Sequence, residues 1–148
     1  MVFRNYLLVF SIVSLSIGSC SKKEVPVYSD KIEVITLAET SKMWNGEALP
    51  NYHEGTPKVT ILKVIIPPKS KLELHKHLVI NAGVLIKGNL TVVDEHGNTK
   101  ELKEGEGLVE LVNTYHYGEN KGDVPAEIIV VYAGTVGVPI TVLKHSEE

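Results

Sequence analysis

Short runs of apolar and β-branched residues, separated by turn-forming residues, make up most of the chain from residue 32 onward. Within many runs apolar and polar side chains alternate, which is the pattern of a strand with one buried face. Pro67-Pro68, Lys87-Gly88-Asn89 and His96-Gly97-Asn98 mark turns between them. No amphipathic helical period interrupts this succession. The pattern therefore predicts an all-β domain, either a barrel or a jelly roll.

The alternation and the turns together predict ten strands. They are expected at residues 32–37, 58–66, 72–77, 83–87, 89–94, 99–103, 108–112, 116–119, 126–133 and 140–143. The longest stretch without strand character covers residues 41–55 and contains Trp44, which we expect to fill the core rather than to clamp a ligand. With 148 residues, 43% of them hydrophobic, the chain can form one compact core.

The first 19 residues have the composition of a signal peptide. Arg4 is followed by an apolar run over residues 6–17, which is shorter than the roughly 20 residues of a membrane-spanning helix. Ile17-Gly18-Ser19-Cys20 comes next and resembles the lipobox of bacterial lipoproteins. We therefore expect residues 1–19 to be a signal peptide, residues 20–30 a lipid-anchored linker and residues 31–148 the folded domain.

Cys20 is the only cysteine, so the chain cannot form an internal disulfide. The resemblance to lipoproteins implies that Cys20 is lipidated and that the domain is exported and anchored to a membrane. It would lie on the periplasmic face, at the outer membrane of a Gram-negative cell, or on the cell surface. The alternative is a signal peptide that is cleaved elsewhere, with Cys20 incidental. The net charge of −3 and the lack of a basic face disfavour a nucleic-acid partner.

Four residues carry the candidate chemistry. His75, His77 and Asn81 are separated by even numbers of residues, so on an extended strand their side chains lie on one face. His116 adds a third imidazole from further along the chain. Three histidine nitrogens on one side of a divalent first-row ion leave open positions for a substrate. We therefore predict a transition-metal site, for Fe, Mn, Zn, Ni or Cu, with Asn81 as a fourth ligand or as a residue behind the ligands.

These residues resemble the two sequence motifs of the cupin superfamily. The first motif, G-x5-H-x-H-x3-4-E-x6-G, matches at His75, His77 and Gly88, while Asn81 stands in place of Glu and Lys69 in place of the leading Gly. The second, G-x5-P-x-G-x2-H-x3-N, maps onto residues 105–120. Its glycine, histidine and asparagine are Gly105, His116 and Asn120, whereas Leu111 and Asn113 replace its Pro and second Gly.

The resemblance implies a double-stranded β-helix, or jelly-roll barrel, with a metal bound by the three histidines. It also implies an N-terminal arm packed on the outside of the barrel and a homodimer built through strand contacts. Cupins with three-histidine sites include enzymes that cleave thiols or diketones with dioxygen. The alternative is a barrel whose histidines are relics in a pocket that binds only an organic ligand.

The net charge of the predicted metal site depends on two side chains, Asn81 and Glu110. Asn81 lacks the negative charge of a Glu ligand, so three histidines and Asn81 around a divalent ion would give a net charge of +2 and favour an anionic ligand. Glu110 lies in the apolar run 107–112, where burial of a carboxylate is costly without a partner. Glu110 could replace the missing carboxylate or act as a catalytic base. We expect an outward-facing position instead, with Asn120 orienting the site from behind.

Two functions fit these expectations. The first is a metal-dependent cupin that acts on a small anionic or polyol molecule outside the cytoplasm, as a dioxygenase-type oxidoreductase. The alternative is a non-catalytic module that binds or senses a sugar or an organic acid. A sugar isomerase or epimerase would need an acid–base pair of His and Tyr in the barrel, and the sequence does not place one.

Overall fold

The computed structural model describes residues 30–144. The chain divides into two units between Val34 and Ile35, and every strand of the described residues lies in the second unit. The predicted signal peptide, Cys20 and most of the linker lie outside the described residues. The strands are β1 (Pro57–Ile66), β2 (Ser70–Lys71), β3 (His75–Lys76), β4 (Ile80–Lys87), β5 (Asn89–Asp94), β6 (Thr99–Lys103), β7 (Gly107–Val109), β8 (His116–Asn120), β9 (Ala126–Thr135) and β10 (Val142–Leu143).

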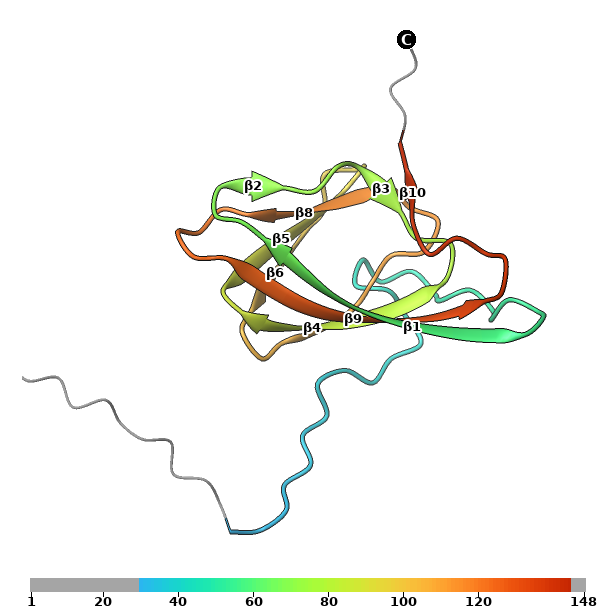
Figure 1. Ribbon diagram of the computed structural model, residues 1–148, viewed down its shortest axis with the longest axis horizontal. Coiled ribbons are helices and arrows are strands. Elements are labelled where there is room, and N and C mark those ends of the chain that lie inside the picture. The colour runs from blue at the N-terminus through green and yellow to red at the C-terminus, as the bar shows by residue number, and fades with distance from the viewer. Residues whose placement is uncertain (1–29, 145–148) are drawn as a thin grey trace, which may run out of the picture. The chain divides into compact units, whose positions relative to one another are not determined.

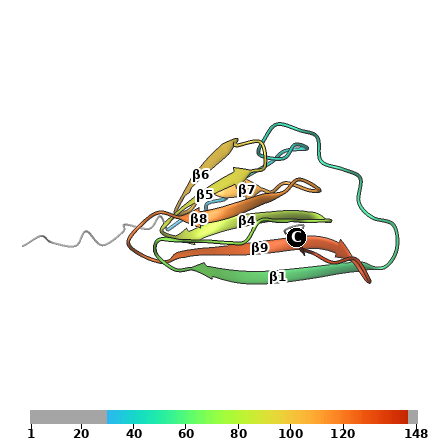
Figure 2. The same ribbon diagram turned by 90° about the horizontal axis from the view of Figure 1, so that it is seen from above.

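Two antiparallel sheets face each other in the second unit. One has the strand order β1-β9-β4-β7, and the other has the order β10-β3-β8-β5-β6, with β2 pairing with β8. Figure 1 shows β3 and β8 in the layer opposite β4 and β9, and Figure 2 shows β1, β9 and β4 side by side. Neighbouring strands are often distant in sequence, as expected for a jelly roll. The all-β double-stranded β-helix predicted from the sequence is confirmed.

The core lies between the two sheets and follows the alternation of the strands. On β9 the inward positions are buried, while the side chains between them lie nearer the solvent. Leu85 from β4 and Leu102 from β6 are almost completely buried in the same cluster. Two-sheet packing therefore accounts for the period-2 pattern of the sequence.

Gly88 joins β4 to β5 in a conformation that favours glycine. Its φ is +76°, and a Cβ at this position would lie 2.8 Å from the carbonyl oxygen of Pro125. Glycine is therefore required on two grounds, because a side chain would strain the backbone and collide with the neighbouring strand connection.

The predicted strand at residues 32–37 is wrong. Residues 33–36 have no strand hydrogen bonding, and Ile35 is 74% exposed. β-branched residues favour strands only where a neighbouring strand supplies a ladder, and this segment pairs with none. At its end the backbone of Leu37 lies against Gly107, where a Cβ would come within 2.9 Å of the Leu37 carbonyl oxygen.

The arm that precedes β1 packs against the barrel. Met43 is buried together with Leu111 and Val112, and Trp44 contacts both this cluster and the main core. The expectation that Trp44 fills core space is confirmed. Within residues 30–144, no helix is long and apolar enough to cross a membrane.

Candidate metal centre

The three histidines of the sequence motifs meet at one point inside the barrel. His75 in β3 is the register partner of His116 in β8, and His77 forms a bridge with Val112. The ring centroids lie 4.7–5.0 Å apart, and one nitrogen from each ring lies within 4.8 Å of the others. All three rings are at least nine-tenths buried. This arrangement can hold a metal ion.

The outer nitrogen of each ring is already engaged. The Nδ1 atoms of His75 and His116 donate to the carbonyl oxygens of Glu73 and Thr114, at 2.7 and 2.9 Å. The Nδ1 of His77 donates to the carbonyl oxygen of Ile140 at 3.0 Å. Because a carbonyl only accepts, each Nδ1 carries the hydrogen and each Nε2 keeps a free lone pair. These backbone carbonyls orient the rings as they do in histidine metal sites.

Burial keeps His75 and His77 neutral. Burial, together with the nearby rings of His116 and His75, lowers the pKa of His77 to about 3. Burial and the His116 ring also lower the pKa of His75. Both rings are therefore uncharged at neutral pH, which is the form that binds metal.

Two buried atoms of this site lack a hydrogen-bond partner. Among the described residues, these are His116 Nε2 and Asn81 Oδ1. An unpartnered buried polar atom costs about 1–3 kcal/mol, so native proteins rarely leave one without a partner. Both atoms are Lewis bases. The donor set therefore fits a divalent transition metal, with the three histidines as ligands and Asn81 near them.

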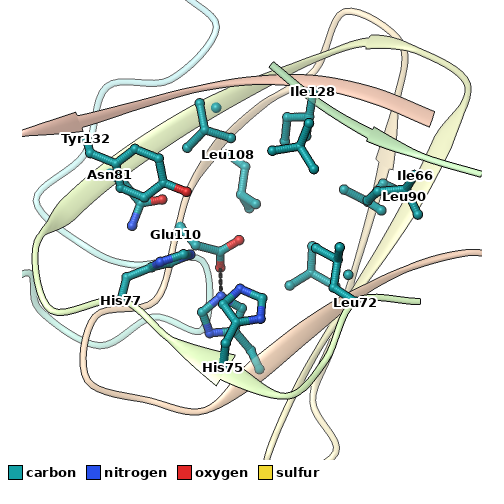
Figure 3. Close-up of a pocket in the computed structure, with 16 residues that line it drawn as sticks. Ile66, Leu72, His75, His77, Asn81, Leu90, Leu108, Glu110, Ile128 and Tyr132 are labelled. Atoms are coloured by element: carbon teal, nitrogen blue, oxygen red, sulfur yellow. Dashed lines mark ion pairs between the residues drawn. The ribbon is translucent and has the colours of Figure 1, made fainter. Parts of the chain in front are cut away.

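Glu110 points into the site, so the expected outward orientation is wrong. Figure 3 shows its side chain pointing toward His75 and His77, and its Oε1 lies 3.8 Å from His116 Nε2. The same Oε1 accepts hydrogen bonds from Trp44 Nε1 at 2.8 Å and from the Leu111 amide at 2.9 Å. These two donors satisfy the carboxylate that an apolar run would otherwise bury without a partner.

The backbone explains how Glu110 reaches the site. Its amide donates to the carbonyl oxygen of Asn81 at 3.0 Å, which makes the two residues neighbours across β4 and the end of β7. A carboxylate thus lies beside the position where the cupin motif has Glu. With a divalent ion, three neutral imidazoles and this carboxylate would give a net charge of +1, not the +2 inferred from Asn81 alone.

Tyr132 also lines this site, although it was not among the candidates selected from the sequence. Its ring contacts His77 edge to face, with centroids 5.3 Å apart. Burial, and then the Glu110 carboxylate, raise the pKa of Tyr132 above its usual value. The hydroxyl therefore stays protonated at neutral pH and can donate a hydrogen bond. The inward parity of β9 was the only signal in the sequence.

Asn120 and the other histidines do not belong to this site. Asn120 is fully buried, but its amide donates to the carbonyl oxygens of Ile66 and Val124, and its Oδ1 accepts from the Gly122 amide. It holds the β8–β9 connection and does not orient the site. The exposed His53 contacts the Leu78 carbonyl oxygen, and His96 is exposed in a turn. His145 lies outside the described residues.

The two sheets and the three-histidine cluster define a jelly-roll barrel with a site for a metal ion. Residues 62–132 match the family described as "Cupin domain". A search of curated proteins finds no match. Residues 62–132 therefore form a cupin domain, as the two sequence motifs suggested.

Solved structures share this fold at low sequence identity. A DMSP lyase, DddQ from Ruegeria pomeroyi, has a TM-score of 0.53 and 18% identity over 61% of this chain and 45% of that chain. A double-stranded β-helix protein from Klebsiella pneumoniae has a TM-score of 0.53 and 18% identity over 78% of this chain and 100% of that chain. An oxalate oxidase in complex with glycolate has a TM-score of 0.50 and 22% identity over 57% and 45%. The chain thus spans less than half of the lyase and of the oxidase.

Proposed function

We propose that this protein is a metal-dependent cupin that acts on a small anionic or polyol molecule outside the cytoplasm, as a dioxygenase-type oxidoreductase. The observation that carries the proposal is the convergence of three Nε2 lone pairs whose Nδ1 partners are all fixed by backbone carbonyls. Such a pre-organised set needs no rearrangement to take up an ion.

Each residue of the site has a distinct role in this proposal. His75, His77 and His116 hold the ion, Glu110 supplies the negative charge beside it, and the neutral Tyr132 hydroxyl donates a hydrogen bond to a bound ligand. A bound divalent ion would supply Lewis acidity, and a redox-active one would also support chemistry with dioxygen. Burial of the rings keeps water away from this chemistry.

Metal analysis of the natively purified chain tests the metal site. Wild type should retain about one ion per chain, as expected for one three-histidine site. The His75→Ala/His116→Ala double variant should retain less than about a tenth of that, because it loses two of three strong ligands. His96→Ala, which changes an exposed histidine, is the control and should match wild type. Stoichiometric metal in the double variant would show that the ligands lie elsewhere.

Measurement of dioxygen uptake distinguishes a dioxygenase from a module that only binds its ligand. With the native metal and a panel of small thiols, diketones and hydroxy acids, a dioxygenase should consume dioxygen in step with loss of substrate. Glu110→Gln should lower this rate without unfolding the chain. A metal-loaded protein that binds members of the panel but turns none over would support the alternative, a binding or sensing module.

We also propose that the chain is a lipoprotein, anchored through Cys20 to a membrane on the periplasmic or outer side. This rests on the apolar run at residues 6–17 and the lipobox-like residues before Cys20. Expressed with its first 19 residues in a bacterium, wild type should incorporate a labelled fatty acid and partition into detergent. Cys20→Ser should lose the label. Equal labelling of the two proteins would refute the anchor without affecting the metal proposal.

A further inference from the structure

The cavity that contains the metal site has two chemically different ends. His75, His77, Asn81, Glu110 and Tyr132 gather at one side of it, and Ile66, Leu72 and Leu90 lie on the other (Figure 3). Leu108 and Ile128 also line the cavity. The polar groups are thus confined to the metal end.

The second end offers a ligand no hydrogen-bond partner from a side chain. Every residue there is aliphatic or glycine. β1 pairs with β9 and β5 pairs with β8 through their backbone groups, and the Leu72 amide donates to the Gly118 carbonyl oxygen. A hydroxyl or carboxylate placed among these side chains would lose its hydrogen bonds to water without replacement. An aliphatic group would instead gain from leaving water.

The size of the cavity limits the ligand further. Its volume is about 60 Å³, less than half of the roughly 150 Å³ of an apolar cavity that binds benzene. An aromatic ring or a hexose is too large, whereas a short chain fits. A net charge of +1 at the metal end, from a divalent ion and Glu110, matches a ligand with one negative charge.

From this geometry we propose that the site takes a small monoanionic chelator with a short aliphatic tail. The oxygen or sulfur head group lies at the end of the histidines and Glu110, and an unbranched tail of about one to two carbons lies among Ile66, Leu72 and Leu90. The inference rests on the proposed function, because the head group binds to the metal. It narrows the ligand class by excluding polyols and dianions.

Gly118 provides a way to shorten the apolar end. A Cβ at this position would point among Leu90, Leu72 and Ile66, 3.3–3.7 Å from their methyl carbons, so Gly118→Ala adds one methyl group without meeting the backbone. Gly134 is the matched control. A Cβ there would make ordinary contacts of 3.4–3.6 Å with Lys58 and Val79, outside the cavity.

The experiment is calorimetric titration of the full chain, loaded with Co²⁺ to a measured stoichiometry, with aliphatic hydroxamic acids of increasing length. Affinity should rise about fourfold per methylene, equivalent to about 0.8 kcal/mol, until the tail fills the cavity. It should then fall. 3-Hydroxypropionohydroxamate, with a hydroxyl at the end of its tail, should lose this gain. Gly118→Ala should move the best tail about one carbon shorter, and Gly134→Ala should leave it unchanged.

Each outcome separates this inference from the metal site itself. Three results would contradict the proposed ligand class without contradicting the metal site. They are equal affinity for all tails, tighter binding of the hydroxylated tail, and no binding of any hydroxamate by protein that holds stoichiometric Co²⁺. Failure to take up Co²⁺, measured before any ligand is added, would overturn the proposed function and this inference together. If Gly118→Ala does not fold, Leu72→Ala enlarges the same end and must shift the optimum to longer tails.

Discussion

Asn81 and Glu110 show how one residue can take over the charge of another. The two are backbone partners, so a carboxylate at position 110 reaches the region that a carboxylate at position 81 would occupy. Trp44 and the Leu111 amide fix it there. The site therefore regains a negative charge that the cupin motif places elsewhere, and it does so from a neighbouring strand.

If Glu110 supplies the charge that the motif places at position 81, metal affinity should fall when this carboxylate is removed and recover when one is added at position 81. Glu110→Gln keeps the size and shape of the side chain but removes the charge, and should weaken metal binding by about 10- to 100-fold. Asn81→Glu in the same chain should restore most of the affinity, because the carboxylate then stands at the motif position. Competition with a chelator of known affinity measures both. Equal affinity of Glu110→Gln and wild type would place the carboxylate outside the influence of the ion.

The buried histidines predict how the metal-free protein responds to acid. The pKa of His77 falls from 6.5 to about 3 on folding, so between these values the unfolded chain binds more protons than the folded one. The lowered pKa of His75 acts in the same direction. Stability should therefore be complete above pH 6.5 and decline as the pH falls toward 3.

Urea unfolding of the chelator-treated protein at several pH values tests this dependence. His77→Gln should flatten the decline below pH 6.5, because the group that takes up the proton is gone. His96→Gln, at an exposed turn position, should keep the wild-type slope. An unchanged slope in His77→Gln would mean that the histidine does not govern acid stability.

The residues of the site differed in how far the sequence could identify them. His75, His77 and His116 could be grouped because their spacing fits a motif and because alternation places the first two on one face. Glu110 shares the inward parity of Leu108, but an isolated carboxylate in an apolar run is usually outward, and its stabilising partner Trp44 is 66 residues away. Tyr132 was hidden for the same reason, since only tertiary contacts distinguish it from a core residue.

At the level of elements, turns preserve a backbone conformation even where the residue changes. Lys69 and Asn113 occupy two of the four positions where the cupin motifs have glycine, and both have a positive φ, of 56° and 61°. Asn tolerates this conformation well, and Lys does so at some cost. Among the described residues, these are the two non-glycine positions with positive φ. The fold thus requires a positive φ at these turn positions, and glycine is the residue that adopts it at the lowest cost.

A side chain in such a turn has two costs, backbone strain at positive φ and collision with neighbouring atoms. Comparing Gly88 with Gly97 separates them. Both have positive φ, but a Cβ at Gly88 would lie 2.8 Å from a backbone oxygen, whereas at Gly97 nothing lies within 4 Å. Gly97→Ala should cost about 1–2 kcal/mol from the backbone alone. Gly88→Ala should lower the free energy of unfolding by at least about 1 kcal/mol more. Equal losses in urea unfolding would mean that the β4–β5 turn relaxes away from Pro125.

The strands themselves were predictable where turn residues delimit them. β1, β5, β6 and β9 lie within two residues of the predicted ranges, and in β9 the alternation of buried and less buried positions adds to the signal. The segment 72–77 could not be resolved, because pairing, and not propensity, limits β3 to His75–Lys76. The strand predicted at residues 32–37 was wrong for the same reason, since a run of Ile and Val does not reveal whether a partner strand exists.

The outer face of the four-stranded sheet is unusually apolar for a surface. By register Ile61 lies opposite Val131, and Val59 and Ile65 share their face of β1. Their exposed fractions range from 42% to 67%. Lys63 lies on the same face between Ile61 and Ile65 and forms an ion pair with Glu127. Exposed apolar side chains gathered around such a pair mark an interaction site in many soluble proteins. The homodimer predicted from the sequence would cover it, since a two-fold axis brings the same face of two copies together.

A dimer formed through this face should dissociate when the face is charged. We expect the chain from residue 21 onward to have twice the monomer mass in light scattering at micromolar concentration. Ile61→Glu should shift it to the monomer mass, because an unpaired carboxylate would be buried in the interface. Val124→Glu is the matched control, since Val124 is 53% exposed in the β8–β9 connection, and should leave the mass unchanged. A monomer mass for the unaltered chain would contradict the dimer, and dissociation by Val124→Glu alone would place its interface elsewhere.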